Sequence, residues 1–202
     1  MVISHQHHFV FLHLPKTAGT SIEVALGLRY GRTGGWDPNS CEIVGETKHH
    51  VVPAAIPQDY TVFTFVRNPW DRILSYYMFR REPRNAKRRN IHPDERRISF
   101  RDWLLRLDEF RRYRRINAAF TIAVDNQSRI IGDLPQFVGR FENLTEDLNI
   151  ICERVGVEPT ALSNVNPTVH KTEAYAYYYT DETRDIVARL YREDIDRFGY
   201  EF

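Results

Sequence analysis

The stretch "FVFLHLPKTAGTSIEVAL", Phe9 to Leu26, places a short apolar run, a polar loop and a helical pattern directly after one another. The apolar run, Phe9 to Leu14, predicts a buried strand. Apolar residues at helical spacing then predict a helix over residues 20–28, which the glycine at position 27 ends. A strand, a loop and a helix in this order are typical of an α/β domain, in which ligands bind at the carboxyl ends of the strands.

The rest of the chain favours the same architecture. Further strands are predicted at residues 60–66 and 137–141, and helices at residues 70–81, 99–116, 145–155 and 180–198. Strands this far apart in sequence usually pair in parallel, because helices must connect them. We therefore expect one domain over residues 1–202, with an α/β fold in three layers. Its central sheet is expected to be mainly parallel, with helices on both faces.

Composition supports a folded domain without structural metal. The 202 residues are 42% hydrophobic with a formal net charge of +1, enough apolar material for one core. Cys41 and Cys152 form no metal-binding spacing, and we expect both to be thiols. Histidines at positions 5, 7 and 8 are interpreted as part of a frayed terminus rather than a metal site. No run approaches the length of a transmembrane segment and no signal peptide is evident, so we expect a cytoplasmic protein.

The loop "LPKTAGTS", residues 14–21, has the groups that bind an oxyanion. Amides at a helix start bind anions, and Gly19 allows the backbone to approach a ligand closely. Lys16 adds a positive charge, and Thr17, Thr20 and Ser21 add hydroxyl donors. The loop is not a Walker loop, because its lysine precedes the glycine. The alternative is an ordinary strand-to-helix turn with a capping threonine and an exposed lysine.

A second motif, "FVRNPWDRILSYY", follows the predicted strand at residues 60–66. Arg67 stands at the end of this strand, and Ser75 follows eight residues later, about two helical turns away. An arginine can make a paired contact with a terminal phosphate, and a serine hydroxyl can add another hydrogen bond. Alternatively, Arg67 pairs with Asp71 and Ser75 is a small packing residue.

Together, "HLPKTAGTS" and "FTFVRNPWDRILSYY" resemble the two cofactor loops of the PAPS-dependent sulfotransferases, which use 3′-phosphoadenosine 5′-phosphosulfate. The resemblance is closest to the carbohydrate O-sulfotransferase-like enzymes of the sulfotransferase family 2 type. "GRFENLTEDLNIICERVGV" and the C-terminal "YYYTDETRDIVARLYREDIDRFGYEF" are similar to later blocks of that family, so the resemblance covers most of the chain. It implies a P-loop-like nucleotide-binding topology, with PAPS as the sulfate donor and the bisphosphate PAP as the product.

The resemblance also implies roles for individual residues. The first loop grips the 5′-phosphosulfate through Lys16, Thr17, Ala18, Gly19, Thr20 and Ser21. Arg67 and Ser75 hold the 3′-phosphate. The later stretch "VHKTEAY" resembles a basic loop that closes over the nucleotide, which makes Lys171 and Thr172 further cofactor-binding candidates. A surface lysine and a turn threonine are the alternative for this pair.

Sulfuryl transfer by in-line displacement needs a group that stabilises the leaving oxygen and a base that accepts the acceptor's proton. Lys16 suits the first task. For the base, "ETKHHVVPAA" contains His49 and His50, and histidine titrates near neutral pH. In similar carbohydrate-type enzymes a histidine in this segment is the base, so one of this pair is expected to act, His49 first. Glu46 and Glu23 are alternatives, because other members use a glutamate. We expect no catalytic metal, since the sulfuryl group carries less charge than a phosphoryl group.

Residues 80–115 are strongly basic, with fourteen of the 28 lysines and arginines against six acids. This stretch is a solvated helix face, a rim that attracts an anionic acceptor or the cofactor, or a surface for nucleic acid or membrane. No recognition motif accompanies the charge, so we expect no nucleic-acid partner. We expect residues 80–98 to form a mobile loop that faces the acceptor.

The sequence thus predicts a sulfotransferase that moves a sulfuryl group from PAPS to a hydroxyl group. The acceptor is a carbohydrate in the first instance, and a lipid or a small metabolite otherwise. A phosphotransferase on a related scaffold would need a Walker loop and a metal-binding acid after a strand, and the sequence has neither. A non-catalytic module that binds a nucleotide or a glycan would be expected to lack Lys16 or a nearby base. The oligomeric state is left open.

Overall fold

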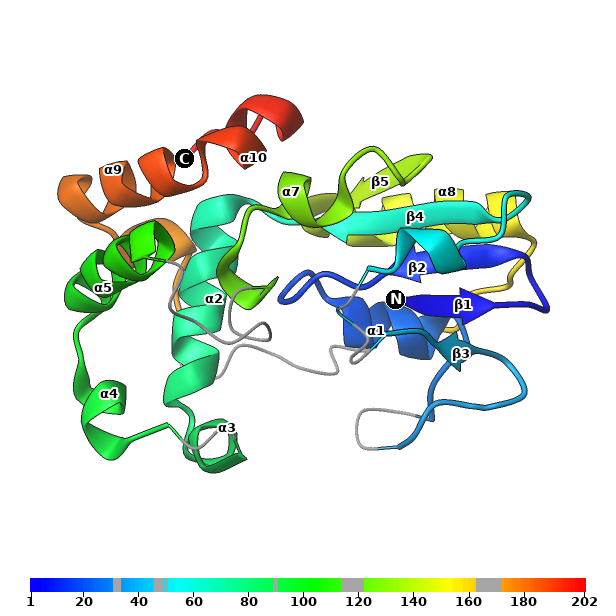
Figure 1. Ribbon diagram of the computed structural model, residues 1–202, viewed down its shortest axis with the longest axis horizontal. Helices are drawn as coiled ribbons and strands as arrows, with labels where there is room; N and C mark the ends of the chain where they lie inside the picture. The colour runs from blue at the N-terminus through cyan, green and yellow to red at the C-terminus, as the bar shows by residue number, and fades with distance from the viewer. Residues whose placement is uncertain (31–33, 46–48, 50, 89–90, 114–121, 163–171) are drawn as a thin grey trace. The chain divides into compact units, whose positions relative to one another are not determined.

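The computed structural model describes residues 1–30, 34–45, 49, 51–88, 91–113, 122–162 and 172–202. The chain divides into two compact units (Figure 1). The first unit contains Met1–Arg67 and Gln127–Pro167, and the second contains Asn68–Asn126 and Thr168–Phe202. A single domain over residues 1–202 stays a prediction.

The first unit contains a mixed sheet of five strands in the order β3-β1-β2-β4-β5. Strand β2 pairs in parallel with β4, and β4 pairs in parallel with β5, whereas β1 is antiparallel to both β2 and β3. The strands are β1 (Val2–Ser4), β2 (Phe9–Leu12), β3 (Glu42–Ile43), β4 (Thr61–Val66) and β5 (Phe137–Arg140). The α/β class, the three predicted strands and their parallel pairing are confirmed. The antiparallel part of the sheet was not predicted.

The N-terminal residues form a β-hairpin, so the interpretation as a frayed terminus is wrong. Strand β1 is buried, and His5, His7 and His8 lie in the turn between β1 and β2. The ring of His8 stacks on Tyr60 with centroids 5.0 Å apart, and Nδ1 of His5 lies 2.9 Å from the Tyr60 hydroxyl. A three-residue strand is too short to show the alternation of apolar and polar residues by which strands are recognised.

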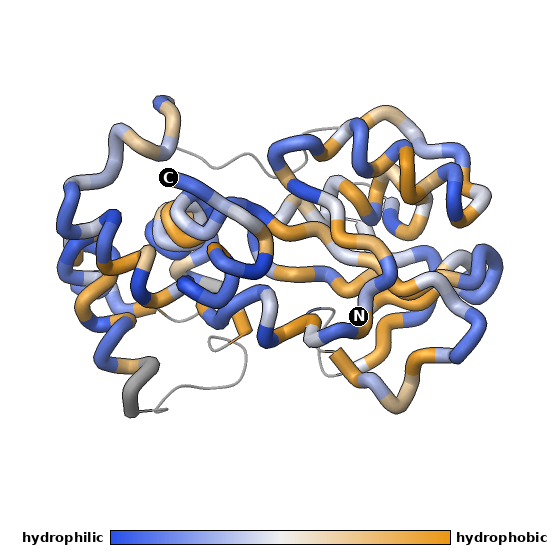
Figure 2. The backbone as a smooth tube through the Cα atoms, turned by 90° about the horizontal axis from the view of Figure 1, so that it is seen from above, coloured by the Kyte–Doolittle hydropathy of each residue, from blue (hydrophilic) through white to orange (hydrophobic). Residues whose placement is uncertain are grey.

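The core of the first unit lies between the sheet and two helices, α1 (Gly19–Ala25) and α8 (Leu144–Val155). Alternate residues of a strand point to the same face, so the phenylalanines of β2 and β4 form one apolar surface. Figure 2 shows hydrophobic residues along these strands. The cluster contains Phe9, Phe11, Phe63 and Phe65 from the strands, Ile22 and Ala25 from α1, and Leu148, Ile151 and Cys152 from α8. The described part of the first unit also contains helix α7 (Gln127–Ile131) and the 3-10 turns η1 (Pro53–Ala55) and η2 (Phe141–Asn143).

The described part of the second unit is helical. Its elements are α2 (Pro69–Arg81), α3 (Pro83–Arg88), α4 (Pro93–Arg97), α5 (Phe100–Tyr113), η3 (Tyr175–Tyr178), α9 (Asp181–Leu190) and α10 (Arg192–Phe198). The amide oxygen of Asn68 caps α2 by accepting a hydrogen bond from the amide of Trp70 at 3.0 Å. The expected loop at residues 80–98 is wrong, because α3 and α4 lie there, each with proline at its first position.

The predicted helix at residues 180–198 is two helices that meet at Tyr191. This residue leaves the helical conformation, with φ −115° and ψ 25°. Its ring is fully buried, and its hydroxyl donates a 2.7 Å hydrogen bond to the carbonyl of Val124. Helical periodicity continues across the break, which explains why the sequence predicted one helix.

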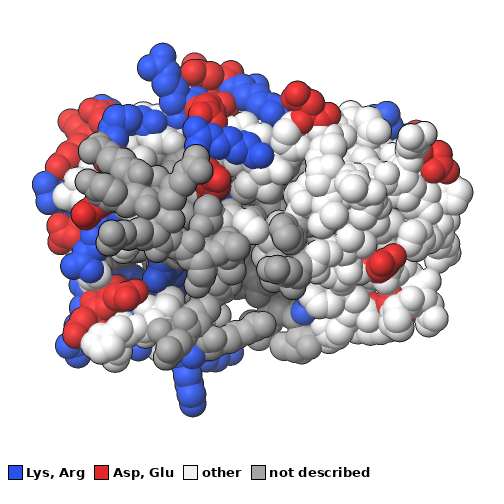
Figure 3. Space-filling view, viewed as in Figure 1, with Lys and Arg blue, Asp and Glu red and all other residues white. Residues whose placement is uncertain are grey.

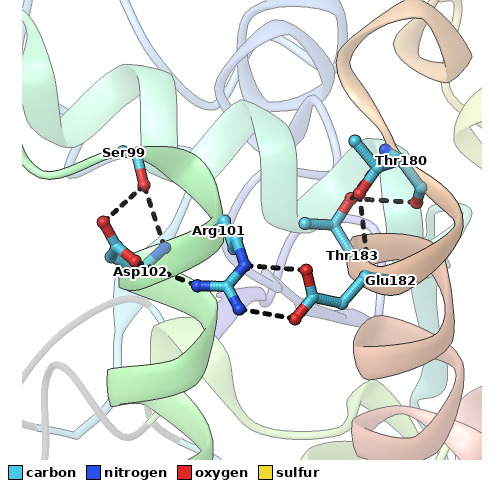
Figure 4. A network of polar contacts seen from close by, with 6 residues as sticks. All are labelled: Ser99, Arg101, Asp102, Thr180, Glu182 and Thr183. Atoms are coloured by element: carbon cyan, nitrogen blue, oxygen red, sulfur yellow. Dashed lines mark hydrogen bonds and ion pairs between the residues drawn. The ribbon is translucent and has the colours of Figure 1, made fainter.

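Helices α5 and α9 are joined by two ion pairs. The guanidinium of Arg101 donates to both carboxylate oxygens of Glu182, at 2.7 and 2.8 Å (Figure 4). About two helical turns further along each helix, Arg189 donates to both oxygens of Asp108 at 3.1 Å. All four residues lie in the second unit, and Arg101 and Glu182 are about half exposed.

The first turns of α5 and α9 are held by side-chain caps, also drawn in Figure 4. Thr180 accepts a hydrogen bond from the amide of Thr183, whose hydroxyl lies 2.8 Å from the amide of Thr180, forming a reciprocal capping box. At the start of α5, the hydroxyl of Ser99 donates to Asp102 at 2.8 Å.

Acids of the same unit balance part of the basic stretch. Arg80 lies 3.2 Å from Glu95, and Arg84 lies 3.0 Å from Glu82. Figure 3 shows lysine and arginine side chains interspersed with acidic ones over this region. These pairs favour the interpretation as a solvated helix face. In the described part of the chain, no helix is both long and apolar enough to cross a membrane.

Candidate functional site

The first predicted loop, residues 14–21, begins after β2 and runs into the first turn of α1, and its backbone is unusual. Lys16 and Ala18 have positive φ angles of 71° and 64°, whereas Thr17 between them does not. Such conformations are costly for residues with a side chain, and they occur preferentially at functional sites. Alternating right-handed and left-handed residues can turn successive amides toward one anion, and the positive φ angles of Lys16 and Ala18 are one part of such a nest.

Two residues of this loop have roles inside the protein. The hydroxyl of Thr17 is buried and donates a 3.0 Å hydrogen bond to the carbonyl of Leu14, which closes the turn. Gly19 lies against the ring of His13: a Cβ at position 19 would be 2.3 Å from Nε2 of that ring. Any larger residue at position 19 would collide with His13. Close packing against His13 is thus a structural reason for glycine at position 19, and the role of Gly19 in cofactor binding stays a prediction.

Arg67, at the end of β4, contacts the first loop. Its guanidinium donates a 3.0 Å hydrogen bond to the carbonyl of Lys16 and lies 3.9 Å above the centre of the Phe141 ring. The side chain is buried, at 5% exposure. Strands β2 and β4 are parallel neighbours, so their carboxyl ends lie at the same edge of the sheet. The structure thus brings Lys16 and Arg67, one from each predicted motif, to one place.

Gln127, which no sequence motif points to, hydrogen-bonds to both backbone groups of Arg67. The side-chain oxygen of Gln127 accepts from the amide of Arg67, and its side-chain nitrogen donates to the Arg67 carbonyl, both at 2.9 Å. Gln127 is fully buried at the start of α7. No motif surrounds it, and sixty positions separate it from its partner.

His49, the first candidate for the base, lies beside the first loop. Its Nδ1 is 2.9 Å from the carbonyl oxygen of His13, and the two rings meet edge to face with centroids 4.6 Å apart. The side chain is half-buried. The second histidine candidate, His50, and the alternative Glu46 lie outside the described residues.

Glu23, another alternative for the base, is fully buried on α1. One carboxylate oxygen contacts Nδ1 of His13, and the other lies 3.6 Å from the guanidinium of Arg29. Burial, together with the charges of Glu23 and Asp37, raises the pKa of the nearby Cys41 thiol to about 11. Through its contacts with both side chains, the Glu23 carboxylate is a buried partner of His13 and Arg29.

The other predicted cofactor residues belong partly to the second unit. Ser75 is fully buried on α2. The amide of Thr172 donates a 3.0 Å hydrogen bond to the hydroxyl of Tyr178, and hydrogen bonds from Thr172 lower the pKa of that phenol. Lys171 lies outside the described residues. Thr20 is half-buried and Ser21 is buried, both on the first turn of α1 in the first unit.

Among the residues that the structure describes, no three His, Cys, Asp or Glu side chains lie together in a way that could bind a metal ion. The fold is that of an α/β protein in which the two predicted loops follow neighbouring parallel strands and meet through the hydrogen bond from Arg67 to Lys16. The chain matches the model of the Sulfotransferase family over residues 1–201, and it belongs to that family. Membership indicates a transferase of sulfuryl groups. No curated protein and no solved structure gives a significant match.

Proposed function

We propose that the chain transfers a sulfuryl group from PAPS to a hydroxyl group of a carbohydrate, with PAP as the second product. The observation that carries this proposal is the 3.0 Å hydrogen bond from Arg67 to the carbonyl of Lys16. It joins the two motifs through which the related enzymes are expected to hold opposite ends of one nucleotide. The P-loop-like topology belongs to the same proposal, since β2, the loop and α1 follow one another as in such sites.

The residues of the first loop suit the 5′-phosphosulfate end of the donor. Lys16 brings a positive charge on a half-buried side chain, and the positive φ angles at Lys16 and Ala18 shape the backbone for an anion. Ala18, Gly19, Thr20 and Ser21 add backbone amides and hydroxyl donors. Arg67 is proposed to bind the 3′-phosphate through its guanidinium, and Ser75, Lys171 and Thr172 are proposed as further cofactor-binding residues.

The proposed step is an in-line displacement at sulfur. The acceptor oxygen forms a bond to sulfur while the bond between sulfur and the bridging oxygen breaks, and the electron pair stays on PAP. Lys16 stabilises the negative charge that develops on this leaving oxygen. The proton of the acceptor hydroxyl passes to a histidine. The step as proposed uses no metal.

His49 is the preferred base because of its hydrogen bond to the His13 carbonyl. A carbonyl oxygen only accepts, so Nδ1 of His49 carries the proton and Nε2 has the lone pair that a base needs. His50 remains the second candidate. Lipid and small-metabolite hydroxyls are the alternative acceptors of this proposal, and the cytoplasm is the proposed compartment.

A transfer assay with labelled PAPS and a panel of hydroxyl acceptors tests this function. Transfer to a carbohydrate hydroxyl is expected, with severe loss in Lys16→Ala and in one of His49→Ala and His50→Ala. Wild-type rates in both histidine variants would remove the histidine base. ATP consumption that depends on magnesium would favour a phosphotransferase instead.

Calorimetric titration with PAP separates donor binding from chemistry. Arg67→Ala is expected to weaken PAP binding, whereas Arg84→Ala, at an exposed ion pair of α3, is expected to leave it unchanged. Equal affinity in both variants would contradict the role of the second motif. Tight PAP binding without turnover on any acceptor would favour a binding module.

A further inference from the structure

His13 is a buried histidine next to the donor loop for which the proposed reaction has no use. It follows β2 directly, is only 5% exposed and lies three residues before Lys16. Its Nδ1 contacts the carboxylate of Glu23, which is fully buried. Buried ionisable groups are costly unless they are paired, so this pair needs a physical reason.

The contacts of Glu23 define the protonation of His13. With Arg29 3.6 Å from its second oxygen, Glu23 is expected to be ionised, and an ionised carboxylate can only accept hydrogen bonds. Nδ1 of His13 therefore carries a proton. On its other side the ring is pressed against Gly19, where a Cβ would come within 2.3 Å. His13 is thus held both by a charge-assisted hydrogen bond and by close packing.

The backbone of this restrained residue holds His49. The carbonyl oxygen of His13 lies 2.9 Å from Nδ1 of His49, and the ring of His13 stands edge-on to that of His49 at an interplanar angle of 88°. One contact selects the proton position on His49, and the other restricts the rotation of its ring. Both depend on where Glu23 holds His13.

We propose that His13, anchored by Glu23, is a positioning residue that fixes the ring orientation of His49 and its Nδ1–H tautomer. In this arrangement Glu23 orients His13, His13 orients His49, and neutral His49 carries its lone pair on Nε2. The inference deepens the proposed function, because it explains how the base is kept in the form that can accept a proton. A wrong tautomer leaves such a base in place but inactive.

Nitrogen NMR of the histidine rings in the full chain tests the inference directly, because ring ¹⁵N shifts distinguish the two tautomers. His49→Gln identifies the His49 signals, and spectra are recorded at a pH where the ring is neutral. Wild-type His49 is expected to be the Nδ1–H tautomer. A wild-type ring protonated on Nε2 would overturn the proposal.

Two substitutions of His13 form a matched pair. His13→Asn keeps a side-chain N–H donor near the position of Nδ1, and His13→Phe keeps a ring but has no donor. We expect His13→Asn to keep the His49 tautomer and most of the turnover. In folded His13→Phe both tautomers are expected, with kcat for sulfuryl transfer reduced at least about tenfold and little change in PAP affinity. An unchanged tautomer and kcat in that variant would overturn the positioning role.

If His13→Phe does not fold, Glu23→Gln replaces it, since the amide is nearly isosteric with the carboxylate. It is expected to give mixed His49 tautomers, and a pure Nδ1–H ring with unchanged kcat would overturn the proposal. His92→Asn is the control, because His92 is an exposed cap of α4 and asparagine is also a good cap. Failure of the proposed function is recognised separately, as absent PAP binding or absent transfer, while the tautomer is measured without any substrate.

Discussion

Charged side chains are used differently in the two units of the molecule. In the first unit, Glu23 is fully buried and contacts His13 and Arg29 beneath the donor loop. In the second unit, Arg101 and Glu182 form a pair with better hydrogen-bond geometry, but both are about half exposed. A buried charge must be paired because the interior solvates it poorly, whereas an exposed pair replaces hydration that water already supplied. The better hydrogen-bond geometry of Arg101 and Glu182 therefore does not mean that this pair contributes more to the stability of the fold than the contacts of Glu23.

The largest expected effect concerns the function of the first region. Lys16→Ala should reduce sulfuryl transfer by a factor on the order of 10²–10³, because one preorganised group that stabilises the developing charge is lost. Alanine keeps a Cβ at this positive-φ position, so the backbone cost is unchanged. The labelled-sulfate assay measures the effect, with Lys87→Ala, an exposed lysine of α3, as control. Equal loss in both variants would show that the charge of the loop has no special role.

Next in size is the stability of the buried pair. Glu23→Leu should lower the free energy of unfolding by about 3 kcal/mol, because His13 and Arg29 lose a buried partner. Urea unfolding followed by circular dichroism measures the change. A double variant that also replaces His13 by leucine should recover part of the loss. A loss of stability no greater than at an exposed ion pair would contradict the contrast between the two regions.

Packing against His13 gives the third effect. Gly19→Ala should cost about 1–3 kcal/mol, because the new methyl group would overlap the ring of His13. Gly35→Ala is the matched control in the same unit, since a Cβ there meets nothing within 4 Å. Thermal unfolding of the two variants is the measurement. Similar melting temperatures would mean that the ring of His13 moves aside easily, and would weaken its positioning role.

A smaller effect reports the charge of Glu23. Burial first, then the charges of Glu23 and Asp37, raise the pKa of Cys41 from 9.0 to about 11. Below the raised pKa the group is mainly the unreactive thiol, so alkylation at pH 9 should be slow and should accelerate as the pH rises toward 11. Glu23→Gln removes one cause and leaves burial, so Cys41 should react moderately faster. Mass spectrometry of iodoacetamide-treated protein measures the rate, and no acceleration would argue that Glu23 is uncharged.

The sequence predicted those features of the molecule that local pattern determines. The strands at residues 60–66 and 137–141 and the helix at residues 70–81 carry strong local signals, and the structure contains them as β4, β5 and α2. The two loops were recognisable because their glycine, lysine and arginine stand in fixed order around strand ends. The role of each site residue stays a prediction.

What the sequence missed depends on contacts between distant residues. The sequence indicated no role for His13, because its partner Glu23 is recognisable only once α1 lies against the loop. Gln127 pairs with Arg67 across sixty positions, with no motif around it. Strand β1 is too short to show a period, and the break at Tyr191 depends on a hydrogen bond to Val124. Each of these was decided by tertiary packing.

The smallest effect is expected at the exposed pair that opened the comparison. The hydrogen bond from Arg101 lowers the pKa of the Glu182 carboxyl, so the pair is favourable, but both groups are solvated. A double-mutant cycle with Arg101→Ala and Glu182→Ala should give a small coupling free energy that decreases as salt is added. Urea unfolding at low and high salt measures it. A large coupling that resists salt would mean that the contact is desolvated in solution, and the contrast with Glu23 would then lie in geometry and not in burial.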